Sequence, residues 1–230
     1  MLFTSCKSCD RRRLGIALVL CGLLCSVISA WAAENQSAEQ YVSKLESSYR
    51  EVRGLRAEFT QTHMWGGRKR FESGTVYFAR GGLMRWEYRE PSEKLFLSDG
   101  KRLYLYLPAM HQLNIQPVKQ SDDMRVPFRL LLSRVNLRRV FARFELDKQE
   151  TNTPTDGRVL RGFPKSADQE GYEEVVMEIS PELDVNRLLV RYVDNSTMEF
   201  TFSSIARNPA INSALFRFVP PAGTEIIEKR

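Results

Sequence analysis

Residues 74–88, GTVYFARGGLMRWEY, contain two short segments in which apolar and polar side chains alternate. The large side chains on one side of this alternation are Val76, Phe78, Met84, Trp86 and Tyr88. A period of two is that of a β-strand with one apolar face, and the glycine pair at 81–82 is typical of a turn. The stretch therefore predicts two antiparallel strands that share an apolar face.

The same alternation continues on both sides of this stretch. Upstream, Ala57, Phe59 and Gln61 alternate with other side chains, before the turn signal at 66–67. Downstream, further strands are predicted at 102–107, 144–149, 159–164, 174–179, 188–193 and 198–205, with a last pair at Phe216 and Phe218. Such short strands indicate an antiparallel meander. No linker divides residues 33–230, so we predict one mainly β (α+β) domain with a large curved sheet and a few helices.

Two regions have helical periodicity instead. Ser37 and Gln40 form a capping box, and the apolar stripe that follows comprises Tyr41, Val42, Leu45, Tyr49 and Val52. Between residues 122 and 141, one or two short helices are predicted from Met124, Phe128, Leu131, Leu132, Val135 and Val140. Pro127 and Asn136 suit the starts of these helices.

The first 32 residues are predicted to be a secretory signal peptide. Four basic residues precede an uncharged run from Leu14 to Ala33, which closes with Ala30-Trp31-Ala32. We expect the exported chain to begin at Ala33 or Glu34. An uncleaved anchor is the alternative, because the run is just long enough to span a bilayer. A lipoprotein signal is excluded, because leucine precedes both cysteines of the run.

Cleavage would change the charge and the cysteine content of the chain. The whole chain has 34 basic and 28 acidic residues, and loss of the leader leaves 30 and 27, a net charge of +3. All four cysteines, at 6, 9, 21 and 25, leave with the leader. The exported domain would therefore have no disulfide, thiol nucleophile or thiolate metal ligand, and would be stable by packing alone.

Side chains that could carry catalysis are scarce. Both histidines, His63 and His111, are expected on strands and lack the spacing of a metal site. Asp122 and Asp123 are expected to begin a helix, because adjacent residues do not share a helix face as a catalytic pair would. Nucleophile-elbow, P-loop and dinucleotide motifs are absent from the sequence. We therefore expect a protein that is not an enzyme and has no metal or cofactor.

Four arginines fall in the second predicted helical region as two i,i+4 pairs: Arg134, Arg138, Arg139 and Arg143. They could form a patch for nucleic acid or anionic lipid. A solvated helix face is the favoured interpretation, because the net charge is low and export excludes most nucleic acid.

The apolar face of the predicted sheet has two interpretations. Its side chains can fill an ordinary core, or they can line a ligand cavity if the sheet curls into a wide, partly open barrel. Periodicity alone favours the core.

Motifs in a fixed order extend over essentially the whole chain after the leader. They are Phe59-Thr60-Gln61, Gly74-x-Val76-x-Phe78-x-Arg80, Met84-x-Trp86, Pro91, Ser98-Asp99-Gly100, Leu103-Tyr104-x-Tyr106-x-Pro108, Gln112, Pro127-Phe128 and Phe216-x-Phe218-x-Pro220-Pro221-x-Gly223. Each motif is weak alone, but their order and spacing are specific. In this respect the chain resembles the LolA family of periplasmic outer-membrane lipoprotein carriers.

The resemblance implies an unclosed antiparallel β-barrel with a lid of short α-helices over an apolar cavity. The acyl-chain cavity would be lined by Phe59, Val76, Phe78, Met84, Trp86 and Tyr88. The lid would present Tyr41, Leu45, Tyr49, Phe128, Leu131 and Leu132. Arg80 matches the family arginine that bonds to the lid in the closed state, and it shares strand parity with Val76 and Phe78, which directs it to the apolar face. Two departures, Gly81 for proline and Tyr104 for tryptophan, affect the expected lid geometry.

The resemblance also implies the partners. Such carriers take acylated lipoproteins from an inner-membrane ATP-driven releasing complex and pass them to an outer-membrane lipoprotein receptor. We accordingly expect a soluble periplasmic monomer without a nucleic-acid partner. One alternative is a LolA-fold protein that senses lipid or lipoprotein, although such proteins usually carry a second domain. A cell-envelope hydrolase would need a nucleophile–base pair, and a receptor of this fold would need a lipobox cysteine.

Overall fold

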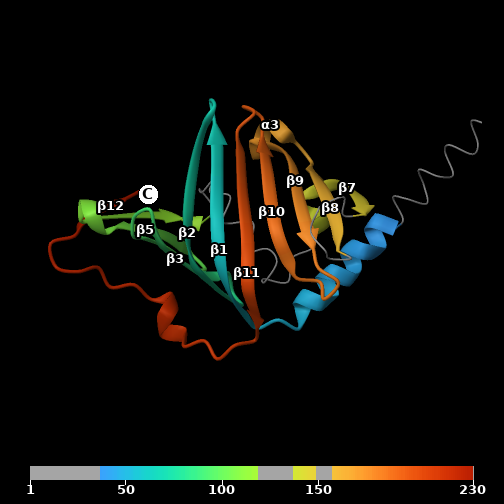
Figure 1. The fold of residues 1–230 in the computed structure, drawn as a ribbon. Coiled ribbons are helices and arrows are strands. Elements are labelled where there is room, and N and C mark those ends of the chain that lie inside the picture. The colour runs from blue at the N-terminus through green and yellow to red at the C-terminus, as the bar shows by residue number, and fades with distance from the viewer. Residues whose placement is uncertain (1–36, 119–136, 149–156, 230) are drawn as a thin grey trace, which may run out of the picture.

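The alternating segments pair into one curved sheet, shown in Figure 1. The computed structural model describes residues 37–118, 137–148 and 157–229. Within these residues the sheet has twelve strands in the order β12-β6-β5-β4-β3-β2-β1-β11-β10-β9-β8-β7. In the described part of the chain its edge strands, β12 and β7, do not pair with each other, so the barrel is unclosed. This confirms the predicted mainly β fold.

The sheet has two halves that meet in its middle. The first half is a meander of β1 (Gly54–Trp65), β2 (Arg68–Ala79), β3 (Leu83–Glu90), β4 (Lys94–Asp99), β5 (Arg102–Leu107) and β6 (Gln112–Pro117). The second comprises β7 (Phe141–Lys148), β8 (Arg158–Pro164), β9 (Tyr172–Ile179), β10 (Val185–Tyr192) and β11 (Thr197–Arg207). The halves join where β1 pairs antiparallel with β11, which places Phe59 opposite Phe202.

Glycines shape the β1–β2 hairpin and its neighbour. Gly66 and Gly67 have φ angles of 51° and 74°, which a two-residue hairpin turn of the primed type requires. Gly74 lies where the pairing of β2 with β3 is irregular, between Ser73 and Gly74. A Cβ atom at Gly74 would lie 1.9 Å from the carbonyl oxygen of Glu87, so only glycine allows the strands to approach this closely.

Helical segments occupy little of the described chain. The N-terminal helix spans residues 37–50 and runs along the lower right of the sheet in Figure 1. The other helical elements described are short: η1 (Pro108–Met110), η3 (Leu137–Arg139), α3 (Ala167–Glu170) and η4 (Ser213–Phe216). Most of the second predicted helical region lies outside the described residues.

The C-terminal segment corrects two predictions. Phe216 ends η4 instead of lying on a strand, because the side chain of Asn212 caps this turn by accepting a hydrogen bond from the Ala214 amide at 2.9 Å. The last strand is β12 (Glu225–Glu228), and it pairs parallel with β6, so the barrel is not entirely antiparallel. Its exposed Ile226 and Ile227 are adjacent and therefore give no alternating signal.

One histidine also lies elsewhere than predicted. His63 is on β1 as expected, but His111 ends η1 with a left-handed φ of 48°. A proline at the start of η1 favours this turn between β5 and β6.

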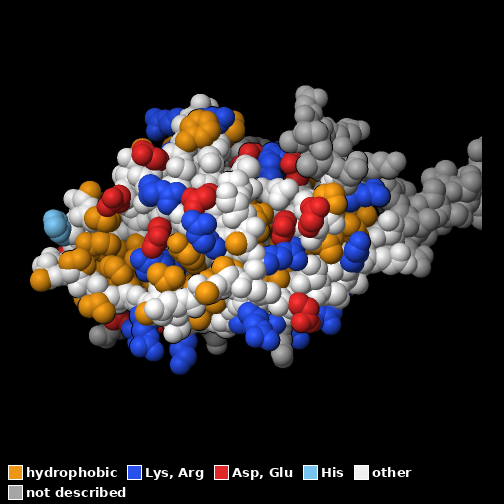
Figure 2. Space-filling view, turned by 60° about the horizontal axis from the view of Figure 1, so that its bottom comes forward, with side chains coloured by type: hydrophobic (Ala, Val, Ile, Leu, Met, Phe, Trp, Pro, Cys, Tyr) orange, Lys and Arg blue, Asp and Glu red, His pale blue; other side chains and the backbone are white. Residues whose placement is uncertain are grey.

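The two faces of the sheet differ in chemistry. On the outer face, Arg187 bonds the carboxylates of Glu178 and Glu199 at 2.7 Å each. Arg161 bonds Glu174 on the neighbouring strand at 2.9 Å. Figure 2 shows charges of both signs interspersed over the face of the molecule that it views. Such pairs add little stability each, but they keep the outer face polar, while alternate side chains turn to the inner face.

Candidate functional site

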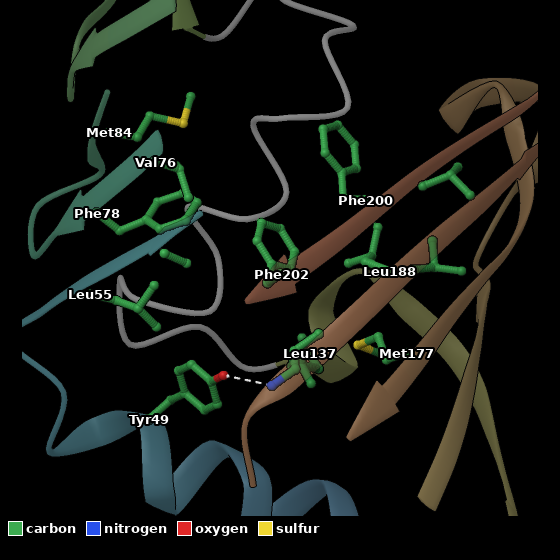
Figure 3. Close-up of a cluster of buried hydrophobic side chains, with 14 of the residues drawn as sticks. Tyr49, Leu55, Val76, Phe78, Met84, Leu137, Met177, Leu188, Phe200 and Phe202 are labelled. Carbon is green, nitrogen blue, oxygen red and sulfur yellow. Dashed lines mark hydrogen bonds between the residues drawn. The ribbon is translucent and has the colours of Figure 1, made fainter. Parts of the chain in front are cut away.

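The inner face of β1, β2 and β3 carries all six side chains predicted for the apolar cavity. Phe59, Val76, Phe78, Met84, Trp86 and Tyr88 are all buried and belong to one hydrophobic cluster. The strand register brings them together, because Val76 lies opposite Trp86 and Phe78 opposite Met84. Figure 3 shows Val76, Phe78 and Met84 projecting toward the same interior.

Trp86 lies at the centre of this aromatic group. Its ring centroid is 4.8 Å from that of Phe59 and 5.6 Å from that of Phe78, both in edge-to-face geometry. Phe200 of β11 approaches the same ring at 5.3 Å. Aromatic rings in these arrangements attract one another beyond the effect of burial alone, so the inner face is a packed aromatic surface.

The sequence analysis missed the second half of this surface. Phe200, Phe202, Leu188 and Met177 belong to the same buried cluster, and Figure 3 shows them on the side opposite Met84. They lie on β11, β10 and β9 and reach the cluster because β11 pairs with β1. The alternation of Phe200 and Phe202 within a predicted strand was the available signal, but it did not reveal which strand would lie next to it.

The N-terminal helix covers part of this inner face. Leu45 is fully buried and Tyr49 nearly so, while Tyr41 packs against the cluster from a half-buried position. The Val185 amide donates a hydrogen bond to the Tyr49 hydroxyl at 3.3 Å, drawn as a dashed line in Figure 3. Burial raises the pKa of Tyr49 above its ordinary value, so the hydroxyl stays neutral. The other predicted lid residues, Phe128, Leu131 and Leu132, lie outside the described residues.

Arg80 contacts the end of the N-terminal helix. Its Nε donates to the Val52 carbonyl oxygen at 3.3 Å, and its Nη2 donates to the Arg50 carbonyl oxygen. The residue follows β2 in the turn and is exposed, so the prediction that it points into the apolar face is wrong. The strand ends at Ala79, and the alternation of faces ends with it. A cation at a helix C-terminus complements the helix dipole and satisfies carbonyls that have no partner in the helix.

Arg138 forms a second connection to this helix. Its Nε donates to Glu39 Oε2 at 2.7 Å and its Nη1 to Glu46 Oε2 at 3.1 Å. The backbone amide of Leu137 donates to the other Glu46 oxygen at 2.6 Å. The prediction of a solvated helix face is therefore wrong for Arg138. The predicted i,i+4 pair of Arg139 and Arg143 on one helix is also wrong, because Arg143 lies on strand β7.

An Arg138→Ala variant should lose about 2 kcal/mol of unfolding free energy, because it removes charge-assisted bonds and leaves the mostly buried Glu46 carboxylate with fewer donors. Urea denaturation followed by circular dichroism measures the change. Arg139→Ala is the matched control, because Arg139 is the next residue in the chain and its side chain is exposed. Equal stability of the two variants would mean that Arg138 does not hold η3 to the helix.

A polar network borders the aromatic surface at one end. The Tyr88 hydroxyl donates to Gln61 Oε1 at 2.6 Å, and Gln61 Nε2 donates to Glu72 Oε2 at 3.2 Å. Lys94 Nζ lies 2.7 Å from Glu72 Oε1. Gln61 and Glu72 are both buried, so each depends on these partners for the hydrogen bonds it would make in water. The apolar surface thus ends in a polar border.

A groove of about 480 Å³ lies beside the N-terminal helix. Its apolar lining includes Tyr41, Leu146 and Leu183, and all three pack against the central cluster. The groove therefore leads from the surface to the edge of the inner face.

Neither a metal-binding cluster of side chains nor a membrane-spanning helix occurs among the described residues. Residues 37–118, 137–148 and 157–229 contain no group of three or more His, Cys, Asp or Glu side chains placed to hold a metal ion. In the same residues, none of the helices has the length and apolarity needed to cross a bilayer.

The described residues thus form a half-open β-barrel with a continuous apolar inner face beneath a helix. The model of the family "Outer membrane lipoprotein carrier protein LolA" matches residues 50–219. The chain belongs to the LolA family, which confirms the resemblance seen in its motifs.

Individual relatives agree with this assignment. The outer-membrane lipoprotein carrier protein of Dechloromonas aromatica (strain RCB) is 30% identical over 188 residues, which cover 81% of this chain and 86% of the relative. The protein of the same name from Bordetella avium (strain 197N) is 27% identical over 218 residues, 92% of this chain and 95% of the relative. Among solved structures, an uncharacterized conserved protein from Thermus thermophilus has a TM-score of 0.53 at 15% identity, covering 84% of this chain and 99% of that one. The structural likeness concerns the fold alone.

Proposed function

We propose that this protein carries acylated lipoproteins across the periplasm after removal of the predicted leader. It accepts them from an inner-membrane ATP-driven releasing complex, shields their acyl chains on the inner face, and passes them to an outer-membrane receptor. Its role is binding and transfer without catalysis. The observation that carries the proposal is the continuous apolar inner face, which extends from Met84 on β3 to Met177 on β9 beneath one helix.

The packing of this face suggests how it would take up acyl chains. Trp86 contacts both Phe59 and Phe200, so acyl chains must replace these contacts when they enter. The N-terminal helix covers the face and is held at one end by Arg80 and along its length by Arg138. We propose that this helix is the lid, that Arg80 is its latch, and that the six predicted aromatic and aliphatic side chains contact the acyl chains.

Free energies indicate why a carrier of this kind needs help from membrane complexes. Moving one acyl chain of about 15 methylenes out of water is favourable by roughly 12 kcal/mol. Several chains together would exceed the practical ceiling of roughly 18–21 kcal/mol for non-covalent affinity, so opening of the closed face must offset part of the gain. Transfer from a bilayer is nearly neutral, because lipid is equally apolar. Loading must therefore be driven by the releasing complex.

Binding of a triacylated lipopeptide tests the proposal through Trp86. The chain has three tryptophans, of which Trp31 lies in the predicted leader, so a Trp65→Phe variant without the leader reports on Trp86 alone. We expect the triacylated peptide to shift the emission of Trp86, because acyl chains would replace its aromatic neighbours. The same peptide without acyl chains is the control. An equal response to both peptides, or no response to either, would contradict acyl-chain binding at the inner face.

A further inference from the structure

We propose that the overhanging end of the β1–β2 hairpin is a docking surface for an anionic lipid bilayer. The hairpin end comprises residues 62–71, and it is separate from the inner-face cluster. This goes beyond the carriage of acyl chains, because it concerns how the protein approaches a membrane surface.

The hairpin extends beyond the strand next to it. β2 begins at Arg68, but its pairing with β3 covers only Ser73 to Ala79. The first five residues of β2 therefore have β1 as their only strand neighbour among the described residues. Figure 1 shows the turn of this hairpin standing above β3.

Large apolar side chains are exposed at this end. Met64 is 48% exposed and Phe71 is 54% exposed. The register pairs Thr62 with Phe71 and Met64 with Lys69, so both apolar side chains lie on the same face of the hairpin. Val193, in the adjacent β10–β11 turn, is a further apolar side chain with 46% exposure. Exposed apolar side chains that are grouped at a projecting end indicate a surface that binds a partner, whereas single scattered ones do not.

Three consecutive cations accompany these apolar side chains. Arg68, Lys69 and Arg70 are all exposed, and Lys69 Nζ lies 4.5 Å from the centroid of the Phe71 ring. Arg70 bonds Glu72 at 2.8 Å, whereas Arg68 and Lys69 form no ion pair within the described residues. The adjacent β10–β11 turn adds the carboxylate of Asp194, and helix α3 beside it adds those of Asp168 and Glu170, so the excess of positive charge belongs to the hairpin end itself.

Cations interleaved with exposed Met and Phe side chains fit the interface of an anionic bilayer. Phospholipid phosphates attract the arginine and lysine heads, while the apolar side chains enter the boundary between headgroups and acyl chains. An acidic protein surface would also attract the cations, but it would leave Met64 and Phe71 without an apolar environment unless it supplied matching pockets. The combination of charge and apolar exposure therefore favours the bilayer.

Co-sedimentation with protein-free vesicles tests this docking surface. We expect the purified protein to bind vesicles that contain phosphatidylglycerol, to bind pure phosphatidylcholine vesicles much more weakly, and to dissociate in high salt. Arg68→Ser combined with Lys69→Ser should lower the partition coefficient about 25-fold, at about fivefold per cation. Met64→Ser combined with Phe71→Ser should weaken binding at unchanged net charge.

The matched control is Lys101→Ser combined with Arg217→Ser. Both are exposed cations, and Lys101 lies in the β4–β5 turn, which approaches Gly81 at the opposite end of the sheet. This control removes the same charge and should bind nearly as the wild type does. Equal losses in the hairpin and control variants would show that only net charge matters and would overturn the proposal. A second result would also overturn the proposal: binding only to native membranes, and loss of that binding after the membranes are treated with trypsin. This result would show that the hairpin binds a protein partner. Lipopeptide binding by the hairpin variants should remain normal, which separates this proposal from that of acyl carriage.

Discussion

In a Met84→Glu variant, we expect the affinity for a triacylated lipopeptide to fall about a hundredfold while the secondary structure is kept. Met84 is fully buried in the inner-face cluster, so a carboxylate there must either lose its hydration or force the face to open. We expect the face of the empty variant to open and hydrate the carboxylate. Acyl chains would have to bury it again, which costs several kcal/mol. Lipopeptide titration measures the affinity, and circular dichroism measures the fold.

Two further variants make this result specific. Met84→Leu keeps the volume and the apolar character, so it should bind the lipopeptide as the wild type does. Leu105→Glu puts a charge at a partly buried position that packs against the same cluster. The fold should tolerate a charge there more easily than at Met84. This variant should also weaken lipopeptide binding. If Met84→Glu unfolds and Leu105→Glu binds normally, the inner face is a packed core and acyl chains bind elsewhere.

Local alternation explains why so much of the fold could be predicted. In residues 74–88, a period of two sets both the strands and the face to which Val76 and Trp86 turn. The glycine pair at 66–67 fixes a tight turn by its backbone conformation, without help from distant residues. The parallel pairing of β12 with β6 could not be predicted in this way, because it depends on the path of the C-terminal segment around the sheet.

The candidate site could be predicted only in part, for a related reason. Phe200 contacts Trp86 because two strands far apart in the sequence become neighbours, and alternation within a strand does not indicate its partner. Arg138 was interpreted from its spacing to other arginines, whereas its partners, Glu39 and Glu46, lie on a helix near the start of the domain. Charged groups find partners through tertiary structure, so their roles are the hardest to infer from local patterns.

Replacing Arg80 with leucine should make the carrier hold acyl chains more tightly and release them more slowly. In the described structure, the guanidinium donates to the carbonyl oxygens of Val52 and Arg50. If loading moves the helix, these hydrogen bonds break. The wild type then loses their stabilising free energy when it binds acyl chains. Leucine makes no such bonds, so the loaded state becomes relatively more favourable. For an exposed arginine the difference is about 1 kcal/mol, or about fivefold in lipopeptide affinity.

The comparison that decides the role of Arg80 is transfer of a lipoprotein from the loaded carrier to membranes that bear the receptor. Arg53→Leu is the matched control, because Arg53 is an exposed arginine just after the same helix and its side chain forms no bond within the described residues. We expect Arg80→Leu to accept cargo and to transfer it about fivefold more slowly, with Arg53→Leu near the wild-type rate. A closed state held by Arg80 would drive this release, because closing regains both carbonyl bonds as the acyl chains leave. Equal transfer rates for all three proteins, with equal binding of an apolar dye to the inner face, would remove Arg80 from the mechanism.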